Sequence, residues 1–249
     1  MAIQKNRYAE VPEDSEITVA AAEFIEQSRY DDIPSDALAI GRRCVLDGLG
    51  LQVAGTDHET AVLLARSAAD QGGREDALLL GHGDKKVPAA MAARVLGTAG
   101  HAHDWDDSQV SIDPDHVYGL LTHPTIPALT ASLVIAQARG GVNGKEFMLA
   151  FLTGFEVECK ISEWMFSQHY TRGFHSSGTV GTFGAFGAAA KLLGLEGDQL
   201  RHGLGLVASF AAGIRCNFGT MTKPLHVGRA SENGVTAARL AKQGYTADR

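Results

Sequence analysis

Cysteine is scarce in this 249-residue chain, and its three cysteines, Cys44, Cys159 and Cys216, lie far apart in the sequence. No C-x-x-C pair occurs, so the spacing indicates neither a zinc knuckle nor a disulfide framework. Widely separated thiols, odd in number, are typical of reduced cysteines. We therefore expect a cytoplasmic protein.

Long apolar runs and basic clusters are also missing. No run of about 18 apolar residues is present, so no membrane span is expected, and residues 1–16 lack the apolar segment of a secretory signal. Lys and Arg total 22 against 29 Asp and Glu, and they are scattered rather than gathered in a stripe. Nucleic acid is therefore not an expected partner. A net charge of -7 still allows an anionic substrate, because local cations decide binding.

What the sequence does contain is a helical pattern rich in glycine. Hydrophobic residues make up 45% of the chain, and 29 residues are glycine, which suggests close helix packing and sharp turns. Apolar spacing predicts a helix from Ile17, and a single short strand or hairpin edge at 77–80. The further predicted helices cover about 34–54, 59–71, 87–100, 124–139, 144–166, 177–193, 198–212 and 227–244. We predict an all-α multi-helix bundle, with residues 1–14 as a flexible N-terminal arm and 15–249 as one helical domain.

The stretch from His101 to Pro124 holds an unusual concentration of groups that carry protons. It contains His101, His103, Asp104, Asp106, Asp107, Ser108, Asp113, Asp115, His116 and His123. Neighbouring carboxylates raise one another's pKa values and imidazoles lower them, which is the setting in which general acids and bases are tuned. A solvated, Asp-rich loop is the alternative interpretation. A metal site built from His101, His103, Asp104 and His123 is a second alternative, although the spacing matches no short metal motif.

Two further segments carry candidate binding groups. His175, Ser176 and Ser177 precede a predicted helix whose N-terminus could hold a carboxylate. The glycines at 178, 181, 184 and 187 continue along that helix and indicate close packing rather than a nucleotide loop, which would need a preceding strand. Lys223 precedes Pro224, so we expect it in an extended loop, where it could pair with a substrate carboxylate. Arg215 could supply a second cation, and a surface lysine is the alternative at 223.

Taken together, these segments resemble the MmgE/PrpD family, which includes 2-methylcitrate dehydratase, cis-aconitate decarboxylase and iminodisuccinate epimerase. The matching stretches are G-H-A-H-D-W-D-D-S, T-H-P-T-I-P-A-L, G-F-H-S-S-G-T-V-G-T-F-G-A and G-T-M-T-K-P-L-H-V-G-R-A-S-E-N-G, in the same order and spacing over about residues 15–247. The resemblance implies the helical domain of that family.

The resemblance also implies an active site and no metal or other cofactor. By this resemblance, the active site would be lined by Asp104, Ser108, His123, His175 and Lys223, with His226 close by. Within this set we predict Asp104, His123, His175 and Lys223 as catalytic residues. Substrate-binding roles are predicted for Ser108, Ser176, Arg215 and His226.

Members of that family are about twice as long and carry a second, smaller α/β domain that closes over the site. The chain would then be a fragment, half of a split gene whose lid domain is a separate chain, or a domain reused for another purpose. The predicted function is a lyase, or its large half, acting on a small di- or tricarboxylic acid. Dehydration of 2-methylcitrate is the leading reaction, and decarboxylation or epimerisation is the alternative. A non-catalytic helical dimerisation module is the alternative of another class, and the family also implies a homodimer.

Overall fold

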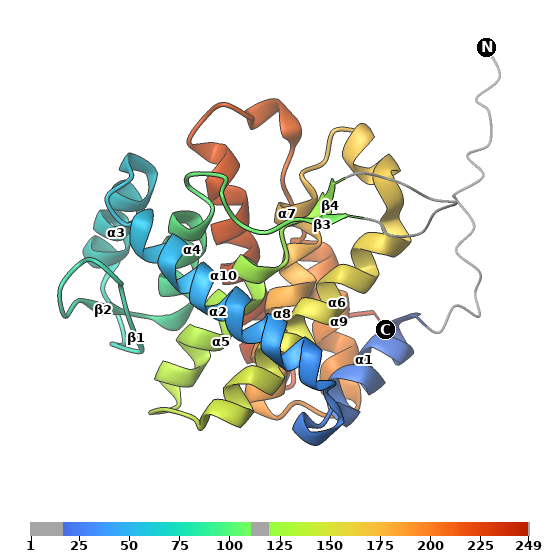
Figure 1. Cartoon of the computed structure of the whole chain (residues 1–249). Helices are drawn as coiled ribbons and strands as arrows, with labels where there is room; N and C mark the ends of the chain where they lie inside the picture. The colour runs from blue at the N-terminus through green and yellow to red at the C-terminus, as the bar shows by residue number, and fades with distance from the viewer. Residues whose placement is uncertain (1–16, 111–119, 249) are drawn as a thin grey trace, which may run out of the picture.

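The computed structural model describes residues 17–110 and 120–248, which form a bundle of α-helices (Figure 1). The predicted N-terminal arm lies outside the described residues. In chain order the helices are α1 Ile17–Gln27, α2 Ser35–Ala54, α3 Glu59–Gln71, α4 Ala89–Gly100, α5 Thr125–Ala138, α6 Gly144–Thr171, α7 Ser176–Thr179, α8 Gly181–Leu193, α9 Asp198–Phe210 and α10 Thr222–Lys242. Two short 3-10 helices cover Tyr30–Asp32 and Arg215–Asn217. The predicted all-α class is confirmed.

Strands are few and short in the described part of the chain. β1 (Ala77–Leu78) pairs antiparallel with β2 (Lys86–Val87), which confirms the predicted hairpin edge. The pairing of β3 (Gln109–Val110) with β4 (Leu120–Thr122) was not predicted from the sequence. This second pair has a functional consequence, because it brings the two ends of the His- and Asp-rich stretch together.

The core is centred on α8, which packs against α5, α6 and α10. Alanine and glycine fill most of α8, and the helix is buried nearly all round, as expected of a central helix. The close packing predicted for the glycine row is confirmed. A Cβ on Gly187 would meet Gly154 of α6, and one on Gly181 would meet Pro127 of α5. A step of three residues falls short of a full helical turn, so the row drifts around the axis and its members face different helices.

The bounds of two predicted helices differ in the structure. Asn143 caps α6 as expected, with its side chain accepting a hydrogen bond from the Glu146 amide at 3.0 Å. However, α6 continues to Thr171, beyond its predicted end near residue 166. The single helix predicted over 177–193 is divided at Val180 into the four-residue α7 and the longer α8.

The segment 214–224 lies between two predicted helices and is held by short-range hydrogen bonds. It contains the 3-10 helix Arg215–Asn217, and α10 begins at Thr222, earlier than the predicted 227. The Thr220 hydroxyl accepts a hydrogen bond from the Thr222 amide at 3.2 Å, which stabilises this start. The prediction of an extended Lys223 was therefore wrong. Pro224 is tolerated because amides in the first helical turn have no intrahelical partner.

None of the described helices combines the length and apolar character needed to cross a bilayer.

Candidate active site

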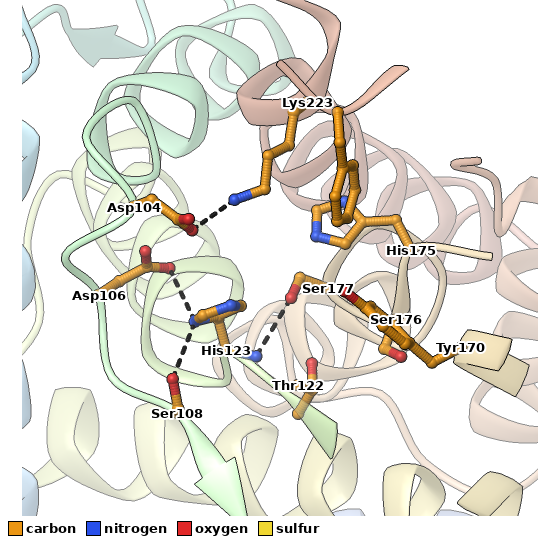
Figure 2. Close-up of a pocket in the computed structure, with 11 residues that line it drawn as sticks. Asp104, Asp106, Ser108, Thr122, His123, Tyr170, His175, Ser176, Ser177 and Lys223 are labelled. Atoms are coloured by element: carbon orange, nitrogen blue, oxygen red, sulfur yellow. Dashed lines mark hydrogen bonds and ion pairs between the residues drawn. The ribbon is translucent and has the colours of Figure 1, made fainter. Parts of the chain in front are cut away.

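The segments that the sequence singled out meet at one cavity of about 440 Å³ (Figure 2). They arrive from the loop after α4, from β4, from the end of α6, from α7 and from the start of α10. The cavity is lined by Asp104, Asp106, Ser108, Thr122, His123, Tyr170, His175, Ser176, Ser177, Phe218 and Lys223. Its size suits a small polar molecule.

Asp104 and Lys223 form an ion pair on one side of this cavity. The Lys223 Nζ atom lies 2.5 Å from Asp104 Oδ1. Burial by itself would raise the pKa of the Asp104 carboxyl, but the hydrogen bond and charge of Lys223 outweigh it and the pKa is lowered. Asp104 has a φ of 59°, and no other non-glycine residue in the described ranges has a positive φ. Strained backbone of this kind gathers at functional sites.

His123 lies at the end of β4 and is held through its backbone and its ring. Its amide donates to the Ser177 hydroxyl at 3.2 Å, and its Nδ1 lies 2.8 Å from the Asp107 carbonyl oxygen. A carbonyl can only accept, so Nδ1 carries the hydrogen and Nε2 of the neutral ring is left as an acceptor. The Ser108 hydroxyl lies 3.4 Å from the same Nδ1. His123 is thus oriented with a basic nitrogen free.

His175 and His226 form a buried imidazole pair, with their Nδ1 atoms 3.0 Å apart. Burial lowers the pKa of His175 to about 2, and the nearby His101, His226 and Lys223 add to this effect. Burial also lowers the pKa of His226. Both rings are therefore neutral at neutral pH. Because α7 is only four residues long, the helix dipole expected to hold a carboxylate beside His175 is small.

A second layer of polar residues supports the cavity from below. Asp107 accepts hydrogen bonds from the Thr125 amide at 3.2 Å and the Thr125 hydroxyl at 2.8 Å, which fixes the start of α5. Burial raises the pKa of Asp107. Glu158 of α6 is fully buried and accepts a hydrogen bond from the Thr122 hydroxyl at 2.7 Å. Burial raises its pKa well above the ordinary value, which favours the protonated form of Glu158.

The structure brings most of the predicted site residues together. Asp104, Ser108, His123, His175, Ser176 and Lys223 line the cavity, and His226 lies behind His175. Arg215 does not line it. The Arg215 guanidinium stacks on the Tyr170 ring at 3.8 Å and donates a hydrogen bond to the Tyr170 carbonyl at 3.0 Å. Arg215 therefore supports Tyr170, which lines the cavity, and its predicted contact with substrate stays a prediction.

The cavity also includes residues to which the sequence assigned no individual role. Asp106 and Ser177 were named among the candidate groups without a role of their own, and Thr122 could have been indicated by its position next to His123. Tyr170 and Phe218 carried no comparable signal, because they reach the cavity only through the packing of α6 against the segment before α10. Asp113, Asp115 and His116 lie outside the described residues.

Within the described ranges, His101, Asp104 and Asp106 form a group compact enough to hold a metal ion, with candidate ligand atoms within 4.8 Å of one another. The Lys223 ammonium already contacts Asp104 and would repel a cation there. His101 Nδ1 is also hydrogen-bonded to Asp106, at 2.8 Å from Oδ1. This donor set fits a hydrogen-bonded ion-pair network better than a metal centre. Metal-independent catalysis stays our prediction.

Comparison with known proteins agrees with the arrangement of these segments. Residues 19–249 match the protein family described as the MmgE/PrpD N-terminal domain. The human cis-aconitate decarboxylase is 30% identical over 92% of this chain and 46% of its own length. The mouse enzyme is 29% identical over the same shares, and the Aspergillus terreus enzyme is 29% identical over 94% of this chain and 47% of its own. The chain spans about half the length of these curated relatives. Since the family match covers nearly all of the sequence, the chain belongs to the MmgE/PrpD family.

Proposed function

We propose that this chain provides the helical part of a lyase that acts on a small di- or tricarboxylic acid, with decarboxylation of a cis-aconitate-like substrate as the leading reaction. The observation that carries the proposal is the cavity itself. It places the Lys223 ammonium, an ionised Asp104 and the oriented base His123 around about 440 Å³ of space. The names of the relatives favour decarboxylation over the other reactions of the family.

The chemistry of such a decarboxylation fits these groups. In cis-aconitate, the bond between the methylene carbon and its carboxyl carbon breaks, and carbon dioxide leaves without the electron pair. That pair forms a new double bond, and the former double-bond pair moves to the far alkene carbon, which takes up one proton. Negative charge builds on the carboxylate next to that carbon. A cation that holds this carboxylate and an acid that delivers the proton would therefore accelerate the reaction.

Each role then has a candidate residue. Lys223 would hold a substrate carboxylate, as a charge-assisted contact. Asp104 and His123 would form the acid and base pair that moves the proton, and Ser108 lies where it could orient the substrate beside His123. His175 is neutral, so it would act as a hydrogen-bond partner rather than as a cation. Ser176 would add a hydroxyl to the same wall.

Dehydration of 2-methylcitrate is the second candidate, since removing a proton beside a carboxylate uses the same cation and base. In that reaction an acid would assist the departure of hydroxide. The enzyme would then be a carbon-oxygen lyase rather than a carbon-carbon lyase. Epimerisation of an iminodisuccinate-like acid shares the first proton transfer. The substrate panel below separates the three reactions.

We also propose that the protein is a homodimer and that a lid, in the same or a separate chain, completes the site. Exposed apolar side chains on α2 support self-association, because Ile40 is 50%, Leu46 75% and Val53 57% exposed. A purely structural role for the domain, as a dimerisation module, is the alternative of another class. It would leave the polar cavity without a purpose.

The experiment is an assay in deuterated buffer with cis-aconitate, 2-methylcitrate and iminodisuccinate, followed by proton NMR. The leading proposal expects cis-aconitate to lose carbon dioxide and to gain one deuteron at the former alkene carbon. His123→Gln should bind the acid but lose turnover. If all three acids are neither bound nor converted, the enzymatic proposal is wrong and the dimerisation module takes its place.

A further inference from the structure

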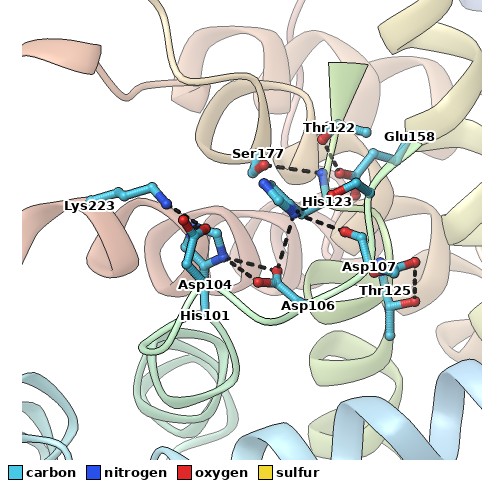
Figure 3. A network of polar contacts seen from close by, with 11 residues as sticks. His101, Asp104, Asp106, Asp107, Thr122, His123, Thr125, Glu158, Ser177 and Lys223 are labelled. Carbon is cyan, nitrogen blue, oxygen red and sulfur yellow. Dashed lines mark hydrogen bonds and ion pairs between the residues drawn. The ribbon is translucent and has the colours of Figure 1, made fainter. Parts of the chain in front are cut away.

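His101 is a buried histidine that has no assigned role in the proposed chemistry. It is 1% exposed and follows directly after α4. Its Nδ1 lies 2.8 Å from Oδ1 and 2.9 Å from Oδ2 of Asp106 (Figure 3). Its Nε2 is buried and has no hydrogen-bond partner. One end of the ring is therefore firmly held and the other end is unsatisfied.

The protonation of this ring follows from its partner. A carboxylate can only accept, so Nδ1 of His101 donates and carries the hydrogen. In the neutral ring, Nε2 is then a buried lone pair without a donor. Leaving such a group unsatisfied costs about 1–3 kcal/mol, so its presence beside the cavity residues Asp104 and Asp106 calls for an explanation.

Asp104 is the group that faces this nitrogen. Its Oδ1 lies 3.8 Å from His101 Nε2, too far for a hydrogen bond, while Lys223 holds the same oxygen at 2.5 Å. The Asp104 side chain is 56% exposed and that of Lys223 is 17% exposed. A substrate carboxylate that competes for Lys223 would leave Asp104 without its cation and beside a bare imidazole nitrogen.

We infer that His101 is a positioning residue for Asp104: when a substrate carboxylate takes Lys223, Asp104 exchanges that lysine for His101, and one proton from solvent binds to His101 Nε2. The resulting imidazolium lies between the carboxylates of Asp104 and Asp106. No other bond forms or breaks, and the proton is supplied by buffer. This inference deepens the proposed function and rests on it, because it assumes that the ligand is a carboxylate.

The surroundings favour this exchange. On its own loop, His101 faces Asp104 and Asp106. The ring of His123 from β4 lies 5.1 Å away and that of His175 lies 5.6 Å away, centroid to centroid. From α10, Lys223 and His226 complete the set. Burial keeps His175 uncharged, so once Lys223 is engaged by the ligand, the strongest charges on His101 are those of the two carboxylates.

The test is isothermal titration calorimetry of tricarballylate into the protein at neutral pH, in buffers with different enthalpies of ionisation. Tricarballylate is a saturated tricarboxylate without the double bond that the proposed decarboxylation needs, so no proton is taken up by turnover. Binding to the wild type should take up roughly one proton per site. His101→Gln and Asp104→Asn should each reduce this number toward zero. The matched control is His82→Gln, because His82 also has a buried, unpartnered Nε2 but lies in the β1–β2 hairpin. Uptake of a proton that survives His101→Gln, or its absence in the wild type, would overturn the inference.

A second measurement needs no ligand. Lys223→Met removes the lysine as the substrate would, so nitrogen NMR at neutral pH should detect a protonated Nε2 on His101 in this variant and an unprotonated one in the wild type. The same protonation state in both proteins would contradict the exchange. This result is independent of turnover. If cis-aconitate proves not to be a substrate, the proposed function fails while the His101 inference is still decided here.

Discussion

Two regions of the molecule differ in how their side chains pack: the interior where α8 meets α10, and the cavity near the ends of these helices. In the interior, small residues let backbones approach closely. A Cβ on Gly234 would lie 2.5 Å from the Phe186 amide nitrogen. Next to the cavity, buried polar side chains keep atoms without a hydrogen-bond partner, such as Nε2 of His101 and Oε2 of Glu158. The interior leaves little room for change, and the cavity keeps groups that a ligand or a proton could satisfy.

This difference indicates how a site with unsatisfied groups can persist. Residues in strained or unsatisfied states remain only where the surrounding structure over-determines them. Here α4, α5, α8 and α10 pack against one another and fix the ends from which the cavity loops depart. Figure 3 shows the polar network beside the cavity, which includes His101 directly after α4, Thr125 at the start of α5 and Lys223 in the first turn of α10. Substitutions in the interior should therefore affect stability first, and substitutions in the cavity should affect binding first.

The largest expected effect comes from breaking the interior. Gly234→Val places a branched side chain against the backbone of α8 at Phe186, which cannot move aside as a flexible side chain could. We expect a loss of about 3 kcal/mol or more in the free energy of unfolding, measured by urea titration. The matched control is Gly50→Ala on α2, where the added Cβ meets nothing within 4 Å. It should gain about 0.5–1 kcal/mol, and equal effects at the two sites would contradict the tight-interior account.

The next effect concerns the proton on buried Glu158. Its raised pKa means that, above the unfolded value near 4.5, the native state binds one more proton than the unfolded state. The contribution of Glu158 to the free energy of unfolding is therefore most favourable below about pH 4.5. It is lost as pH rises toward the folded pKa, at about 1.4 kcal/mol per pH unit. Glu158→Gln does not titrate, so the variant should gain stability relative to wild type as pH rises from 5 to 8. A pH-independent difference in unfolding free energy would show that Glu158 is ionised.

A smaller gain is expected from relaxing the cavity backbone. Asp104 has a positive φ, which costs a non-glycine residue about 1–2 kcal/mol, and glycine adopts the same φ without that cost. The free energy of unfolding of Asp104→Gly should therefore rise by about 1 kcal/mol, while turnover is lost. Asp107→Gly is the control, because Asp107 has no positive φ and binds Thr125 twice. Thermal unfolding should show it less stable than wild type. A loss of stability in Asp104→Gly would mean that its ion pair with Lys223 outweighs the strain.

The smallest effect is expected at Arg215, which supports the cavity from behind Tyr170. Arg215→Ala loses a cation–π contact with Tyr170 of about 0.5–1 kcal/mol. It should raise KM for the substrate about two- to fivefold and leave kcat unchanged. Arg229→Ala, at an exposed helical ion pair, is the control and should leave both constants unchanged. A loss in kcat/KM of a hundredfold would mean that Arg215 contacts the substrate after all.

How far the sequence predicted these features depended on the range of the interactions involved. Most helices followed from apolar periodicity, although α7 and α8 were predicted as one helix and α10 begins earlier than predicted. The stretch from His101 to His123 followed from its concentration of proton-carrying groups. The contact of Arg215 with Tyr170 could not be predicted, because Tyr170 is distant in sequence and meets Arg215 only through tertiary packing. Lys223 was assigned to a loop because the rule for residues before proline was applied without the Thr220 hydrogen bond that starts α10.

The most direct test of the central claim is the affinity of Lys223→Met for cis-aconitate, measured by calorimetry beside wild type. Lys223 is the cation that contacts the cavity carboxylate Asp104, and a charge-assisted contact with substrate contributes about 1.5–3 kcal/mol. The dissociation constant should therefore rise by about tenfold to a hundredfold. Lys160→Met, at an exposed ion pair with Glu163, should bind as wild type does. Equal affinities of Lys223→Met and wild type would contradict the assignment of this cavity as a carboxylate site.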